Sequence, residues 1–221
     1  MLRITDNGNS EYVIIIRKNH SASEKTAAEE LAAYLKKITD AEIPVKTDDE
    51  KKTDHEIVIG FTNRGGKGKK ELGEEGFTIK TEGKRLFILG SEVRGALYGV
   101  YSFLEKCCGC RFYTDTCERV PKVNMLTVPE IDCTELPGFE YRNVYWFAQG
   151  GEMISAKLKN NGGMGHELTE RVGGGINYIG SFCHTFPDLG ETGNVWDMPC
   201  LSDEAMYQTV LKNVRKRLIE N

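Results

Sequence analysis

The sequence has no apolar run long enough to span a membrane and no apolar N-terminal segment of the kind that directs secretion. It also lacks a charge excess, because 29 basic residues stand against 33 acidic ones and the formal net charge is -4. This balance gives no electrostatic argument for binding nucleic acid or an anionic membrane. We therefore expect a cytoplasmic protein with neither nucleic acid nor a membrane as partner.

The seven cysteines do not form a recognisable disulfide or zinc pattern. Cys107, Cys108 and Cys110 crowd the end of one predicted helix, and no second ligand pair of the kind a zinc site needs accompanies them. An odd, clustered set is typical of reduced thiols in a cytoplasm. We expect no metal and no cofactor.

Two catalytic or binding motifs are present only in part. Residues 62–69 resemble a phosphate-binding loop but lack its final Lys-Ser/Thr, and no helix with an apolar stripe follows directly. A flexible basic loop is the favoured interpretation, and nucleotide binding through residues 64–68 is a further hypothesis. The run His166-Glu167-x-x-Glu170 resembles a zinc-protease motif but has no second histidine. Protease activity is therefore disfavoured.

The first hundred residues contain alternating strand and helix signals. A capping box at Ser21 and Glu24 predicts a helix start, and Glu82-Gly83-Lys84 between two apolar runs predicts a hairpin. The predicted strands are 13–16, 57–60, 77–81 and 85–89. The first predicted helix begins at Ser21 or Ser23, and the second begins at residue 91. The pattern predicts an α+β domain in which both helices cover one face of a mixed β-sheet.

The second predicted helix, residues 91–105, contains two unusual glycines. We expect Ser91 to cap it, with an apolar stripe facing its own domain. Gly95 and Gly99 lie one turn apart, and each costs roughly 1 kcal/mol relative to alanine, so close approach of another segment is predicted. A second stripe adjoins them, and we predict that the five residues together form a domain interface. They are Arg94, Gly95, Tyr98, Gly99 and Tyr101.

The composition changes at Phe139, and the chain then repeats a strand–helix pattern twice. The predicted strands are 140–146 and 176–180, and the predicted helices are 152–159 and a last one capped by Ser202. This is the start of a parallel β/α array, and two units cannot bury both faces of a sheet. We expect domains at residues 1–130 and 131–221, the second being the first β/α units of an incomplete TIM-like barrel. Exposed edges from about residue 139 onward predict self-association or poor order.

The run Gly90-Ser91-x-x-Arg94-Gly95-x-x-Tyr98-x-x-Tyr101, closed by Gly109-Cys110-Arg111-Phe112, resembles a helix of a known accessory domain. That zincin-like domain precedes the catalytic barrel in bacterial alpha-glucuronidases, beta-N-acetylhexosaminidases and an uncharacterised family of glycosidase-like proteins. Three later runs resemble the first barrel segments of the uncharacterised family. They are Phe139-x-Tyr141-Arg142, His184-Thr185-Phe186 and Pro199-Cys200-Leu201-Ser202.

The resemblance implies a glycoside hydrolase parent that acts on carbohydrate at the carboxyl ends of its barrel strands. On that basis we expect substrate contacts from Arg142, Trp146 and His184, although Tyr145 and Trp146 could instead fill the barrel end. Glycoside hydrolysis usually needs two carboxyl groups, which in related barrels come from later strands. We assign no catalytic residue and expect an incomplete active site. The alternative is a non-catalytic carbohydrate-binding or structural domain.

Overall fold

The computed structural model describes residues 1–66, 72–162, 167–176, 185–194 and 196–220. The chain divides into two compact units, Met1–Ile176 and Asn177–Asn221. The larger unit is built around a six-stranded sheet with the strand order β10-β5-β6-β4-β2-β3. These strands are β2 (Val13–Ile16), β3 (Val45–Thr47), β4 (Glu56–Ile59), β5 (Phe77–Glu82), β6 (Arg85–Gly90) and β10 (Asp132–Glu135).

The sheet is mixed, as predicted. Strands β2, β3, β4 and β6 run parallel to one another, while β5 pairs antiparallel with both β6 and β10. The predicted hairpin joins β5 and β6, and Glu82 pairs with Arg85 across a two-residue turn in which Gly83 has a φ of 59°. The positive φ explains the glycine, because other residues adopt this conformation at a cost.

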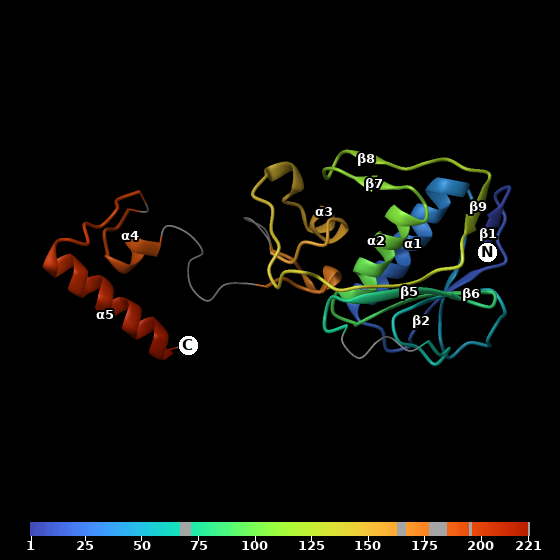
Figure 1. Cartoon of the computed structure of the whole chain (residues 1–221), viewed down its shortest axis with the longest axis horizontal. Helices are drawn as coiled ribbons and strands as arrows, with labels where there is room; N and C mark the ends of the chain where they lie inside the picture. The colour runs from blue at the N-terminus through green and yellow to red at the C-terminus, as the bar shows by residue number, and fades with distance from the viewer. Residues whose placement is uncertain (67–71, 163–166, 177–184, 195, 221) are drawn as a thin grey trace. The chain divides into compact units, whose positions relative to one another are not determined.

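Two helices, α1 (Ala22–Thr39) and α2 (Gly95–Lys106), lie on the same face of this sheet (Figure 1). The predicted capping box at the start of α1 is confirmed, since Ser21 and Glu24 each bond the other's backbone. Alternating strand residues form the main core with the two helices, as the period of two requires. They include Ile14, Ile16, Ile57, Ile59, Ile79 and Ile88. The prediction of helices on one face of a mixed sheet is thus confirmed.

The predicted N-cap of α2 is wrong. The cap residue is Arg94, which has no side-chain cap bond, and the helix begins at Gly95. The backbone oxygen of Glu74 accepts from the amides of Arg94 and Gly95, at 3.1 and 2.9 Å. The Ser91 hydroxyl also donates to that oxygen, at 2.5 Å. A carbonyl brought in by the preceding loop therefore replaces the expected serine.

Strands β2 and β4 are adjacent and parallel. After β2 the chain adds β3 on one side of it and then β4 on the other. The carboxyl ends of β2 and β4 therefore flank the crevice in which open α/β sheets usually bind ligands. In this protein the buried Glu24 side chain fills that crevice. A Cβ added at Gly60 would lie 2.5 Å from Glu24 Oε1, and Glu24 Oε2 accepts from Arg17 Nε and the Ser21 amide, both at 2.8 Å.

Two small antiparallel ribbons flank the helices. One pairs β1 (Leu2–Asp6) with β9 (Met125–Val128), and the other pairs β7 (Arg111–Phe112) with β8 (Glu118–Arg119). The edge-on ring of Phe112 contacts both Tyr34 and Tyr101, with ring centroids 5.5 and 5.6 Å apart. The β7–β8 hairpin is thereby packed against α1 and α2.

Residues 139–176 belong to the first compact unit and contain η1 (Phe147–Gln149), α3 (Glu152–Lys157) and η2 (Glu170–Val172). The predicted helix is confirmed by α3, but the predicted strand at residues 140–146 is wrong. The Arg142 backbone bonds Asn161 and Gly162 instead of a neighbouring strand. No barrel strand occurs among the described residues after 139, and the division at residue 130 stays a prediction.

The second unit contains α4 (Thr185–Leu189) and α5 (Glu204–Glu220), so the predicted last helix is confirmed. Asn213 Nδ2 donates to the Leu189 carbonyl at 2.8 Å and joins the two helices. Most of the predicted strand at 176–180 lies outside the described residues. Within the described parts of the chain, no helix is both long and apolar enough to cross a membrane.

Candidate functional site

A buried carboxylate, Glu75, joins the N-terminal elements to residues 139–176. Its Oε1 accepts from Arg94 Nε and Asn161 Nδ2, both at 2.8 Å, and its Oε2 accepts from Arg142 Nη2 at 2.7 Å. We call these side chains, together with Glu74, the Glu75 network. Glu74 Oε2 accepts from Arg94 Nη2 at 2.9 Å.

The predicted substrate residue Arg142 lies in this network. Its guanidinium donates to Glu75 and to the carbonyls of Lys159 and Phe139, at 2.8 and 2.5 Å. Its backbone amide donates to Asn161 Oδ1 at 2.8 Å. These contacts commit the side chain to acceptors of its own chain, so a role in substrate binding stays a prediction.

The electrostatics of the network depend on burial. Glu75 and Arg94 are buried, and Asn161 has no exposed surface. One carboxylate thus compensates two guanidinium groups that come from different parts of the chain, and removing one partner of such a buried pair is costly. Burial, reinforced by the nearby Glu75 charge, raises the pKa of Tyr98 to about 12.

The five predicted interface residues divide into two groups. Arg94 Nη1 donates to the Gly173 carbonyl at 2.9 Å, and the Tyr98 hydroxyl donates to the Asn160 carbonyl at 3.0 Å, so both contact the segment after residue 139. The Tyr101 hydroxyl instead donates to Glu30 Oε2 at 2.9 Å, on α1.

The two glycines of that set face the sheet of their own domain. A Cβ at Gly99 would lie 2.7 Å from Ile88 Cγ2, and one at Gly95 would lie 2.5 Å from the Gly76 carbonyl oxygen. The predicted close approach is therefore present, but its partners are β6 and the residue before β5. The close approach of the later segment falls elsewhere, at Gly173, where a Cβ would lie 2.0 Å from the Val93 carbonyl oxygen.

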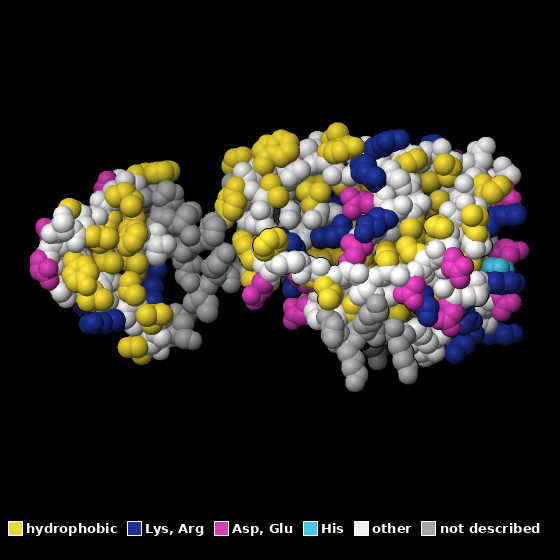
Figure 2. Space-filling view, in the orientation of Figure 1, with side chains coloured by type: hydrophobic (Ala, Val, Ile, Leu, Met, Phe, Trp, Pro, Cys, Tyr) yellow, Lys and Arg dark blue, Asp and Glu magenta, His cyan; other side chains and the backbone are white. Residues whose placement is uncertain are grey.

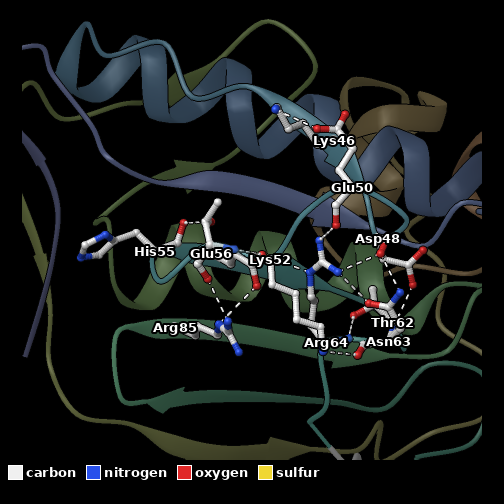
Figure 3. A network of polar contacts seen from close by, with 11 residues as sticks. Lys46, Asp48, Glu50, Lys52, His55, Glu56, Thr62, Asn63, Arg64 and Arg85 are labelled. Carbon is white, nitrogen blue, oxygen red and sulfur yellow. Dashed lines mark hydrogen bonds and ion pairs between the residues drawn. The ribbon is translucent and has the colours of Figure 1, made fainter.

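A second polar network surrounds Arg64, whose guanidinium uses each of its three nitrogens (Figure 3). Nε donates to Glu56 Oε1 at 3.0 Å, Nη1 to the Asp48 carbonyl at 2.8 Å and Nη2 to the Glu50 carbonyl at 2.7 Å. Glu56 also pairs with Arg85 Nε at 3.2 Å. Since Arg64 is buried and each of its guanidinium nitrogens already donates to the protein, it is not placed to hold a phosphate group. The rest of that basic loop, residues 67–71, lies outside the described residues.

Trp146, the second predicted substrate residue, is not part of the Glu75 network. Trp146 is 55% exposed, in the coil before η1, and His184 lies outside the described residues. Tyr145 and Phe147 are exposed beside it, by 53% and 86%. Within unit 1, Figure 2 shows hydrophobic side chains gathered over the β7–β8 hairpin tip and the adjacent loop.

The described residues contain no group of three or more His, Cys, Asp or Glu side chains placed to hold a metal ion. In the zinc-protease-like run, Glu170 begins the three-residue η2, and His166 lies outside the described residues. Burial raises the pKa of Cys107, of Cys108 and, to about 11, of Cys110. A raised pKa disfavours the thiolate, which is the form that attacks as a nucleophile and ligates metals.

Residues 4–103 match the family model described as the N-terminus of glycosyl hydrolase family 67. The N-terminal domain is glycoside hydrolase-related. The match covers less than half of the chain and lies within the larger unit. It includes the glycines and tyrosines of α2, and also the Arg64 network, which therefore belongs to the conformation of this glycoside hydrolase-related domain.

The structures that match part of this chain include several solved glycosidases, each with a TM-score below 0.5. A family GH115 4-O-methyl-alpha-glucuronidase has a TM-score of 0.46 at 14% identity over 64% of this chain and 19% of its own. The Streptomyces coelicolor A3(2) GH20 beta-N-acetylhexosaminidase has a TM-score of 0.41 at 17% identity, and a Streptomyces plicatus beta-hexosaminidase 0.39 at 16%. Both comparisons cover 64% of this chain and 24% of the enzyme. The chain thus spans about a quarter of their length or less. No curated protein matches it.

Proposed function

We propose that this chain is the N-terminal part of a glycoside hydrolase that acts on carbohydrate. In this proposal residues 1–130 form a non-catalytic accessory domain, and the residues from 131 begin a TIM-like catalytic barrel. The observation that carries it is the family match over residues 4–103. The relatedness of that domain supports the class of enzyme, while the substrate sugar and linkage stay open.

The Glu75 network supports a bracing role for the accessory domain. It ties residues 139–176 to α2 and to the loop before β5 through ion pairs and hydrogen bonds of 2.7 to 2.9 Å. Buried, directional contacts of this kind fix the orientation of one segment on another. The accessory domain would therefore hold the first part of the catalytic domain in place without taking part in the chemistry.

Among the three proposed substrate contacts, Trp146 has the best support from its surroundings. Its half-exposed ring is accessible for stacking on a sugar, whereas Arg142 is engaged by Glu75 and two carbonyls. His184 is kept as a proposed contact on the resemblance alone. We propose no catalytic carboxylate in this chain. Glycoside hydrolysis usually needs two carboxyl groups roughly 5 to 9.5 Å apart, and the resemblance implies that they come from later barrel strands.

The test is a titration of the 221-residue chain with N-acetylglucosamine, methyl xyloside and glucuronic acid, followed by tryptophan fluorescence and NMR. We expect weak sugar binding that Trp146→Ala abolishes and Trp196→Ala, at the other and 75% exposed tryptophan, leaves unchanged. We also expect no hydrolysis of 4-nitrophenyl glycosides. Hydrolysis would overturn the non-catalytic assignment, and the absence of any sugar binding would favour the structural alternative.

Self-association through the segment after residue 139 is part of the proposal. Phe139 is 77% exposed, and large exposed apolar side chains favour association. Sedimentation over a range of protein concentrations tests this, with a concentration-independent monomer as the contrary result.

A further inference from the structure

The tip of the β7–β8 hairpin runs beside the segment that carries Trp146. The Asp115 amide donates to the Ala148 carbonyl at 3.1 Å, and Gln149 Nε2 donates to the Tyr113 carbonyl at 2.6 Å. These bonds join the β7–β8 hairpin to residues 146–149. Two segments that are distant in the sequence therefore contribute to one surface.

Three large apolar side chains of these tied segments remain exposed. Tyr113 is 49% exposed, Trp146 55% and Phe147 86%, and the space-filling view shows hydrophobic side chains gathered there (Figure 2). Solvent-exposed rings contribute little to folding, so a cluster of them indicates a binding surface. Aromatic rings are also suited to stack on the apolar faces of sugar rings.

The surface is held on both sides before any ligand arrives. The hairpin bonds fix Ala148 and Gln149, while the Glu75 network fixes Arg142 a few residues earlier. The amide of Gln149 also donates to the Trp146 carbonyl at 2.9 Å and closes the turn of η1. Such preorganisation reduces the entropy lost when a ligand binds.

Polar groups at the hairpin tip border the aromatic side chains. Thr114 and Thr116 form a local turn, in which the Thr116 amide donates to Thr114 Oγ1 at 3.3 Å. Asp115 is exposed between them, and in the part of the chain that the structure describes no hydrogen bond or ion pair engages its carboxylate. A free carboxylate accepts hydrogen bonds from sugar hydroxyls and repels an acidic sugar.

We propose that the β7–β8 hairpin tip, through Tyr113 and Asp115, forms a carbohydrate-binding surface with Trp146 and Phe147, and that it selects neutral sugars over uronates. The proposal rests on the proposed function, to which it adds a contribution of the hairpin and a substrate class. The aromatic rings supply stacking, and the Asp115 carboxylate accepts from the sugar hydroxyls and disfavours a second carboxylate.

The experiment records NMR titrations of the complete 221-residue chain with N-acetylglucosamine, methyl xyloside and glucuronic acid. We expect the neutral sugars to shift the amide signals of Tyr113, Asp115 and Phe147 and to bind at least several-fold more tightly than glucuronic acid. Tyr113→Ala should weaken neutral-sugar binding by about tenfold, as the loss of one aromatic contact implies. Asp115→Asn should remove the discrimination against glucuronic acid. Tyr207→Ala, at an exposed tyrosine of α5, is the matched control.

The outcomes separate this inference from the function on which it rests. If Trp146→Ala abolishes binding while Tyr113→Ala and Asp115→Asn change nothing, the hairpin inference is overturned and the proposed function stands. If the wild-type chain binds none of the three sugars, the hairpin inference and the proposed Trp146 contact both fail, and the structural alternative is favoured. Preference for glucuronic acid would overturn the selectivity. A change of oligomeric state in Tyr113→Ala, with sugar binding intact, would identify the surface as a contact between copies.

Discussion

Arg142 donates from Nη2 to Oε2 of Glu75 over 2.7 Å, although 67 residues separate the two in the sequence. The same carboxylate accepts from Arg94, which caps α2. A single acidic residue in the loop before β5 therefore contacts both the start of α2 and the segment 139–176.

Replacing Glu75 with glutamine should release residues 139–176 from the rest of the unit. The change leaves Arg94 and Arg142 without their shared counter-charge, and loss of one partner from a buried ion pair costs about 3–5 kcal/mol. We expect a lower free energy of unfolding in urea and faster hydrogen exchange in α3. Glu74→Gln is the matched control, because the Glu74 side chain is 68% exposed and should contribute at most about 1 kcal/mol. Equal effects of the two substitutions would contradict the central role of Glu75.

Gly99→Ala should destabilise the whole domain and leave the contacts of residues 139–176 in place. The added Cβ would lie 2.7 Å from Ile88 Cγ2 and 3.2 Å from Phe77 Cβ, and such overpacking costs about 1–3 kcal/mol. The measurement is the midpoint of urea unfolding. At Gly138 an added Cβ meets nothing within 4 Å, so Gly138→Ala should be neutral or slightly stabilising. A loss of hydrogen-exchange protection confined to α3 would instead indicate that Gly99 takes part in the contact of α2 with residues 139–176.

Arg64→Met should reduce stability and have no bearing on nucleotide binding. The Arg64 and Glu56 side chains are 1% and 0% exposed, so the substitution removes one of the two ion-pair partners of a buried carboxylate and costs about 3–5 kcal/mol. Arg85 and the Thr53 amide remain as partners of Glu56. Thermal unfolding with and without ATP gives both results in one assay. We expect a large fall in Tm for the variant and no shift with ATP for either protein. An ATP-dependent rise in the wild type would revive the nucleotide hypothesis.

The elements that could be predicted from the sequence are those that local chemistry determines. The capping box at Ser21 involves residues three apart, and the β5–β6 hairpin depends on the turn at Gly83, so both could be predicted. The strand expected at 140–146 failed for the opposite reason. Its aromatic and β-branched composition fits a strand, but strand formation also needs a partner, and the partner there is Asn161.

The Glu75 network had no signal in the sequence. Glu75 is one of three acidic residues around a glycine in an unremarkable loop, and Asn161 lies in an Asn-Asn-Gly run that is typical of a turn. Their pairing with Arg94 and Arg142 depends on how the segment after residue 139 packs. Arg94 and Tyr98 contact that segment while the glycines contact the sheet, and the domain-interface role predicted for α2 stays a prediction.

Stability should fall as the pH rises above about 10, in part through Tyr98. Its pKa is raised to about 12 in the folded state, above the ordinary value of 10, so the phenol ionises first in unfolded chains. The contribution is complete below pH 10 and is lost as the pH rises through 12, at up to about 1.4 kcal/mol per pH unit. Urea unfolding between pH 8 and 11 measures the slope, which Tyr98→Phe should reduce. Tyr207→Phe, at an exposed ring, should not change it.

The Glu24 carboxylate at the junction of β2 and β4 has a consequence for ligand binding as well as for packing. It lies at the amino end of α1, where the helix dipole favours an anion, and it carries the same sign of charge as a phosphate. The protein thus supplies internally the anion that such a crevice attracts, and Gly60 is kept without a side chain to make room for it. The Glu24 carboxylate occupies the position that an external anion would take. A substitution that removes this carboxylate would therefore leave the crevice open to an external anion.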